Sequence, residues 1–163
     1  MSSTGERGMT MTGRKQQFKL GSTLFSFTNE FWMRELTFEQ LIARVGELNL
    51  GPGLEVIGFQ SIRDFPRVTD DFAARFRDLM ARYRLEPSSL AINADVWLRR
   101  GGKPLSIEET ADYLEPQIRA AAKLGFPVVR SQLELSTEFL ERLLPVIEKL
   151  GVRVGPELHA PWT

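Results

Sequence analysis

Two hydrophobic periodicities alternate along the chain and predict five strands separated by four helices. Short apolar runs, typical of buried strands, are each followed by a stretch in which apolar residues recur every three or four positions. The predicted strands cover residues 19–27, 54–59, 89–96, 126–132 and 152–159. The resulting order, βαβαβαβαβ, is typical of a parallel sheet with helices packed against it.

Capping motifs mark where these helices begin. Thr37 with Gln40, and Ser106 with Glu109, match the capping box, in which two side chains satisfy backbone N–H groups of the first helical turn. Further predicted N-caps are Thr69 or Asp70, and Ser136 or Thr137. The helix starts are therefore predicted independently of the apolar pattern.

Glycine and proline positions predict how the helices end or bend. Gly51, Gly125 and Gly151 each follow a periodic stretch, and glycine readily adopts the positive φ that ends a helix. Pro116 lies within the third periodic stretch, so it should kink that helix or restart it with proline in the first turn.

Parallel βα units fit either an open doubly wound sheet or a closed barrel. No G-x-G-x-x-G motif follows the first predicted strand, so a dinucleotide-binding sheet is poorly supported. A full barrel needs eight units in about 250 residues, whereas this chain has 163 residues. The predicted fold class is α/β, with residues 18–163 forming the N-terminal part, about strands 1–5, of a (β/α)8 TIM barrel. Residues 1–17 are polar and are interpreted as a disordered leader, not a secretory signal.

Composition excludes several classes of function. Lys plus Arg and Asp plus Glu both number 21, so no basic excess supports nucleic-acid binding. The chain has no cysteine, which rules out disulfides and thiolate metal ligands within it. No segment approaches the ~20 apolar residues of a transmembrane helix, so no membrane association is expected. We expect a cytoplasmic protein.

Polar residues gather where the predicted strands end, and chemistry in parallel barrels sits at these carboxyl ends. The candidate substrate-binding residues are Ser26, Gln60, Asn93, Asp95, Arg130 and Gln132, and the candidate catalytic residues are Glu157 and His159. Because side chains alternate along a strand, Glu157 and His159 share a face. Converging polar groups suit a polyhydroxylated small molecule such as a carbohydrate, although polar strand ends can also simply reach water.

Glu157 and His159 can be read as two metal ligands or as one ligand and one general base. His159 is the only histidine, so a three-histidine zinc site cannot form within this chain. It could also be a hydrogen-bonded strand-end residue without a role. A carboxylate in an apolar segment, as at Glu157, is costly unless it is paired or binds a metal. Glu55, within the second predicted strand, either points to the barrel mouth or pairs with an arginine.

Three segments carry a resemblance to a known superfamily. Leu54-Glu55-Val56, residues 123–130 and residues 155–159 resemble the xylose-isomerase-like TIM barrels, which include sugar phosphate isomerases and epimerases and AP-endonuclease-2-type proteins. Within that superfamily, residues 24–30, 51–60 and 157–161 resemble the large subunit of bacterial C-glycoside deglycosidases.

The resemblance implies a divalent ion held by carboxylates and a histidine from strands five to eight. Mn²⁺ is the expected ion, with Mg²⁺, Co²⁺ and Zn²⁺ as alternatives. Glu157 matches the first metal ligand, which in the isomerases and epimerases also moves protons next to a carbonyl. In the deglycosidase branch, a histidine at the place of His159 would act as base on a 3-keto sugar. Strands six to eight and their ligands lie outside this chain.

Three functions therefore compete. The first is a metal-dependent carbohydrate isomerase or epimerase that moves a proton next to a sugar carbonyl and of which this chain is one part, with a C-glycoside deglycosidase-type lyase acting on 3-keto sugars as its alternative. The second is a non-catalytic half-barrel that serves as an interaction module, and the third is a truncated product without a function of its own. Because a half-barrel exposes two strand edges, we expect a homo-oligomer or a partner subunit that covers them.

Overall fold

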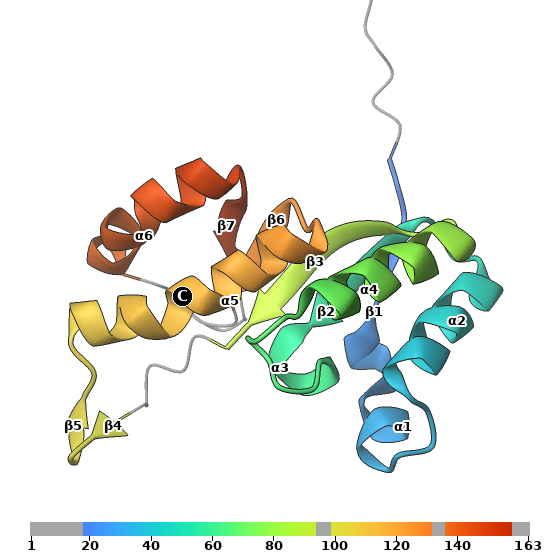
Figure 1. The fold of residues 1–163 in the computed structure, drawn as a ribbon, viewed down its shortest axis with the longest axis horizontal. Coiled ribbons are helices and arrows are strands. Elements are labelled where there is room, and N and C mark those ends of the chain that lie inside the picture. Colours follow the sequence, from blue (N-terminus) through green and yellow to red (C-terminus); the bar gives the residue numbers. More distant parts are fainter. Residues whose placement is uncertain (1–17, 94–98, 132–135, 158–163) are drawn as a thin grey trace, which may run out of the picture.

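The computed structural model describes residues 18–93, 99–131 and 136–157 and contains a five-stranded parallel sheet (Figure 1). Its strands are β1 (Gly21–Thr23), β2 (Gly53–Ile57), β3 (Glu86–Ile92), β6 (Val128–Ser131) and β7 (Arg153–Pro156). They lie in the order β1-β2-β3-β6-β7, so each strand pairs with the next strand of this sheet along the chain. That order has no reversal point, which distinguishes it from a doubly wound sheet.

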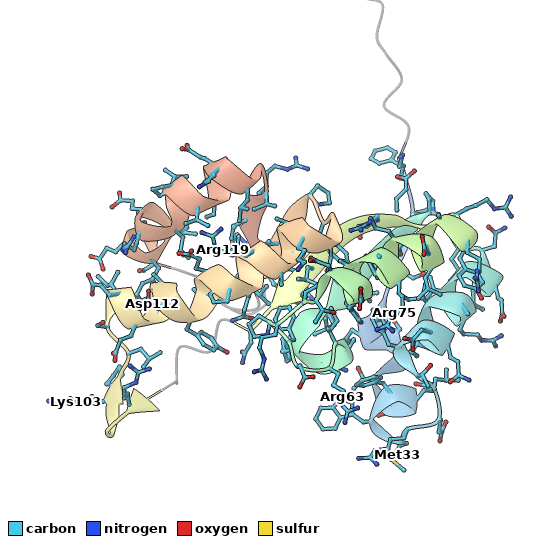
Figure 2. All side chains as sticks on the ribbon, viewed as in Figure 1. Met33, Arg63, Arg75, Lys103, Asp112 and Arg119 are labelled. Carbon is cyan, nitrogen blue, oxygen red and sulfur yellow. The ribbon has the colours of Figure 1, made fainter. Side chains whose placement is uncertain are left out.

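Four long helices connect these strands. They are α2 (Phe38–Leu48), α4 (Asp70–Arg82), α5 (Ile107–Leu124) and α6 (Thr137–Leu150). Consecutive helices contact each other, α2 with α4, α4 with α5 and α5 with α6, and together they form a layer against the sheet (Figure 1). Their solvent side is charged, as Arg75 on α4 and Asp112 and Arg119 on α5 illustrate (Figure 2).

Short elements follow the carboxyl ends of three strands. A 3₁₀-helix, η1 (Leu24–Phe27), and α1 (Thr28–Trp32) follow β1, and α3 (Gly58–Ser61) follows β2. A small antiparallel hairpin of β4 (Arg99–Arg100) and β5 (Lys103–Pro104) lies between β3 and α5. These elements follow the strand ends at which a TIM barrel has its mouth, with the β4–β5 hairpin standing apart from α1 and α3 (Figure 1).

The core lies between the sheet and the helices. Alternate strand residues, among them Leu54, Val56 and Leu90, are fully buried against the helix layer. The other face of each strand, which we call the inner face, points away from that layer. Because the apolar residues of each strand pack against the helices, the residues between them lie on the inner face.

The predicted caps form, with one exception. Both capping boxes are present, and Gly125 (φ 85°) and Gly151 (φ 66°) are left-handed C-caps. The predicted end of the first helix at Gly51 is wrong, because Asn49 takes the left-handed C-cap position with φ 48°. Asparagine tolerates this conformation better than other non-glycine residues, so the helix ends two residues earlier. Of the two alternatives for Pro116, a kink or a restart, the restart is wrong, since α5 is one helix from residue 107 to residue 124.

The first two strands are shorter than predicted, which moves the candidate residue Ser26 off the sheet. The Thr23 hydroxyl accepts the N–H of Phe25 at 3.2 Å and caps η1, so the chain leaves the sheet after three residues. Ser26 therefore lies exposed in η1, and its predicted place on a strand is wrong. Gln60, predicted to follow the second strand, does follow it and lies in α3, because β2 ends at Ile57. Within the described ranges, no helix is both long and apolar enough to cross a membrane.

Close packing of β1 against β2 gives a testable consequence. A Cβ atom at Gly21 would lie 2.7 Å from the carbonyl oxygen of Gly53 on the neighbouring strand, where only backbone movement could relieve it. We expect Gly21→Ala to lower the free energy of unfolding by about 1–3 kcal/mol, as overpacking does. Gly155→Ala on β7 is the matched control, since nothing lies within 4 Å of its added Cβ. Urea unfolding measures both, and equal midpoints would contradict the close approach.

Candidate functional site

A row of polar side chains crosses the inner face of the sheet. Glu55 lies between Leu54 and Val56, which face the helices, so its carboxylate points to the opposite side. The strand register places Thr23 on β1 and Ser89 on β3 directly beside it. Three oxygen-bearing side chains therefore stand on one level of neighbouring strands.

Glu55 is the centre of this row because it accepts four hydrogen bonds. The hydroxyls of Thr23 and Ser89 donate to its two oxygens at 2.8 and 2.7 Å. Arg130, on β6, donates from Nε at 2.8 Å and from Nη2 at 3.2 Å, which makes a two-point ion pair. The side chains of Arg130 and Glu55 are only 21% and 17% exposed, so each shielded charge has a partner.

The remaining terminal nitrogen of Arg130, Nη1, forms an ion pair with Oε2 of Glu157. Glu157 directly follows β7, and its N–H donates to the carbonyl of Ser131 at 2.8 Å, which continues the pairing of β6 with β7. Its side chain is 31% exposed. Arg130 therefore links a carboxylate in the middle of the sheet to one at its carboxyl end.

The other described candidate residues lie at neighbouring strand ends. Asn93 follows β3, where the buried Gln117 of α5 accepts its N–H at 2.9 Å and donates to its carbonyl at 3.0 Å. Gln60 donates to the Thr28 hydroxyl at 2.6 Å and so ties α3 to α1. Three further candidates, Asp95, Gln132 and His159, lie outside the described residues.

The structure brings Arg130 and Glu157 together, and it resolves the alternatives left open for Glu55 in favour of pairing with an arginine. The partners Thr23, Ser89 and Gln117 were not predicted. One signal was available: Glu55 and Arg130 are single charges within otherwise apolar strand segments, and such charges need a partner. The roles of Arg130 and Glu157 in binding and catalysis stay predictions.

The described residues do not assemble a complete metal site. No three His, Cys, Asp or Glu side chains among them lie close enough together to hold an ion. Glu157 nevertheless fits such a site, because carboxylate oxygen is the ligand type that Mn²⁺ and Mg²⁺ prefer. It would be one ligand of a larger set, with the others supplied from outside the described ranges.

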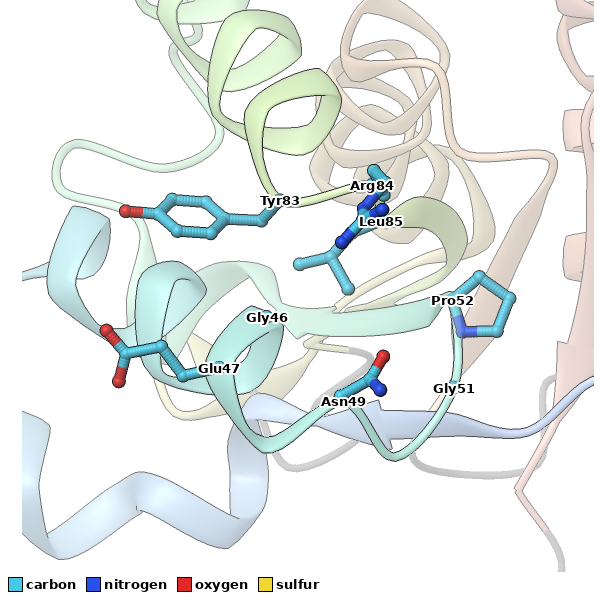
Figure 3. A pocket seen from close by; sticks show the side chains of 8 residues that line it. All are labelled: Gly46, Glu47, Asn49, Gly51, Pro52, Tyr83, Arg84 and Leu85. Carbon is cyan, nitrogen blue, oxygen red and sulfur yellow. The ribbon is translucent and has the colours of Figure 1, made fainter.

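A pocket of about 600 Å³ lies at the opposite end of the strands (Figure 3). It is lined by Gly46, Glu47, Asn49, Gly51, Pro52, Tyr83, Arg84 and Leu85. These residues come from the ends of α2 and α4 and from the segments that lead into β2 and β3. Active sites of TIM barrels form at the carboxyl ends of the strands. The Glu55–Arg130–Glu157 network is therefore the better candidate site.

Comparison with known proteins now bears on this site. No model of a known protein family matches the chain. A C-glycoside deglycosidase alpha subunit from Arthrobacter globiformis is 46% identical over 141 residues, which is 86% of this chain and 38% of that protein. A 3'-dehydrocarminate deglycosidase alpha subunit from a Microbacterium species is 43% identical over 143 residues, 88% of this chain and 41% of that protein. The resemblance to C-glycoside deglycosidase alpha subunits is confirmed. The chain spans about 40% of the length of these alpha subunits.

Solved structures confirm the fold class. A D-psicose 3-epimerase, solved in the presence of D-fructose, matches with a TM-score of 0.61 at 13% identity, over 84% of this chain and 51% of that one. A sugar phosphate isomerase/epimerase from Parabacteroides distasonis gives 0.58 at 14% identity, over 88% and 52%. The IOLI protein, described with a zinc atom, gives 0.54 at 16%, over 85% and 51%. The described fold is thus the N-terminal part of a TIM barrel.

Proposed function

We propose that the chain is part of a C-glycoside deglycosidase alpha subunit and acts on C-glycosides whose sugar carries a 3-keto group. The observation that carries the proposal is the anchored carboxylate of Glu157, which Arg130 holds at the carboxyl end of β7. The 43–46% identity to alpha subunits with this activity in their names supports it. The isomerase and epimerase alternative is supported by the fold alone.

The chemistry follows from the ketone. A carbonyl at C3 of the sugar acidifies the proton on C2, and its removal lets the electrons form a C1–C2 double bond as the bond from C1 to the aglycone breaks. The aglycone carbon then takes up a proton. We assign the removal of the C2 proton to His159 and the binding of a divalent ion to Glu157. When bound, that ion would polarise the sugar oxygens and stabilise the developing negative charge.

Partner requirements also follow from the sheet. Among the described residues, β1 pairs with β2 alone and β7 with β6 alone, so both edges have unused backbone groups. We propose that further strands of the same protein, or a second subunit as the name alpha subunit implies, cover these edges. We also propose a cytoplasmic location and a leader over residues 1–17.

The proposal is tested on the protein as the organism makes it, with any subunit that copurifies. A purified 3-keto C-glycoside and the free 3-keto sugar are incubated separately with this protein, with Mn²⁺ or with a chelator. Mass spectrometry should show aglycone release that needs the metal. An isomerised free sugar without aglycone release would favour the isomerase alternative, and no reaction with either compound would favour an interaction module.

A further inference from the structure

Glu55 and Glu157 stand at different levels of the inner face, and Arg130 lies between them. Arg130 is paired with Ala91, and Ala91 with Ile57, so Arg130 lies one inner-face position closer to the barrel mouth than Glu55. On its other side Arg130 is paired with Gly155, and Glu157 lies one inner-face position further on. The guanidinium therefore spans the step between the two carboxylates.

The planar guanidinium of Arg130 couples the orientation of Glu157 to that of Glu55. Two of its nitrogens bind the two oxygens of Glu55, which fixes the plane and direction of the group. Glu55 is itself held by the hydroxyls of Thr23 and Ser89 on both neighbouring strands. The direction of the third nitrogen, which contacts Glu157, is therefore set by Glu55.

We propose that Glu55 is a positioning residue for Glu157 and acts through Arg130. The inference rests on the proposed function, in which Glu157 is a ligand of a divalent ion. Glu55 holds the guanidinium, the guanidinium holds the Glu157 carboxylate, and Thr23 and Ser89 keep Glu55 in place. Residues beyond the direct ligands commonly orient those ligands in this way.

The negative charge of Glu55 should also favour the binding of a divalent ion, in addition to its effect on the orientation of Glu157. Glu55, Arg130 and Glu157 carry a formal charge of −1 together, which attracts a cation. Replacing Glu55 with glutamine leaves Arg130 and Glu157 as the only charges of the cluster, and their sum is zero. The guanidinium of Arg130 is then also free to turn a second N–H group toward the carboxylate of Glu157. Both effects weaken the binding of a divalent ion.

The test measures Mn²⁺ affinity by isothermal titration calorimetry in the complete protein. We expect Glu55→Gln to weaken the affinity by about 10–100-fold, the range found for residues that support metal ligands. The matched control is Glu86→Gln, which removes a carboxylate of β3 that forms an exposed ion pair with Lys19. That variant should bind Mn²⁺ as the wild type does. Wild-type affinity in Glu55→Gln would overturn the proposal.

A double-mutant cycle tests whether Glu55 acts through Arg130. Arg130→Met removes the link between the two carboxylates, so Glu55→Gln should cost less Mn²⁺ affinity in the Arg130→Met background than in the wild type, where orientation is lost as well as charge. An equal loss in both backgrounds would overturn the proposed route.

Two further variants keep the outcome decisive. If Glu55→Gln fails to fold, Ser89→Ala removes one hydrogen bond to Glu55 without changing any charge, and it should weaken Mn²⁺ binding to a smaller extent. Glu157→Gln separates the two proposals. Wild-type Mn²⁺ affinity in Glu157→Gln contradicts the proposed ligand itself, whereas loss in Glu157→Gln with wild-type affinity in both Glu55→Gln and Ser89→Ala contradicts the positioning role alone.

Discussion

Replacing Glu157 with glutamine in the complete protein is expected to lower kcat/KM for aglycone release by about 10²–10⁴-fold. Glutamine keeps the size of the side chain but removes the negative charge. The variant therefore loses the ion pair that Arg130 makes at the carboxyl end of β7, and it loses the anionic oxygen proposed to bind the metal. Rates are measured with saturating Mn²⁺, and circular dichroism confirms that the variant is folded.

Glu115→Gln is the matched control for this experiment. Glu115 also forms an ion pair with an arginine, Arg119, at 2.7 Å. Both residues belong to helix α5 and not to a strand end. The control should keep the wild-type rate. If Glu157→Gln also stays within about threefold of the wild type, Glu157 is not the carboxylate on which the reaction depends.

Local patterns predicted the helices well because their end signals are local. The capping boxes at Thr37 and Ser106 act within four residues, so no tertiary information is needed to recognise them. The first strand was predicted too long for the opposite reason. Residues 24–27 have the composition of a strand, yet Leu24 alone is buried while Phe25 is 60% exposed. The Thr23 cap, and not the apolar character of the segment, decides where β1 ends.

The sequence predicted which site residues share a face of a strand, but not which side chains they contact. Alternation along the fifth predicted strand placed Glu157 and His159 on one face, because a side-chain period of two depends on sequence alone. The contact between Glu55 and Arg130 joins residues 75 positions apart, and it depends on the register of three strands. A sequence pattern does not supply register between parallel strands joined by long helices. The network that links the two carboxylates therefore appears only in the folded structure.

The largest loss of stability is expected from Phe76→Ala. Phe76 lies on α4, is 1% exposed, and its ring centroid is 6.2 Å from that of Phe38 on α2 and 5.5 Å from that of Phe126, which precedes β6. It thus joins two helices and the entry to a central strand. Removing a buried phenylalanine ring costs about 3–5 kcal/mol through lost burial and the cavity left behind.

Urea unfolding followed by fluorescence measures this loss, and Phe25→Ala is the matched control. The ring of Phe25 is 60% exposed on η1, so its removal should change the free energy of unfolding by no more than about 0.5 kcal/mol. Domains of this size are stable by only about 5–15 kcal/mol, so Phe76→Ala should take a large share of the total and unfold at a much lower urea concentration. Similar midpoints for the two variants would mean that the aromatic cluster is not where the helix layer gains its stability, and the buried aliphatic residues of β2 and β3 would then carry it.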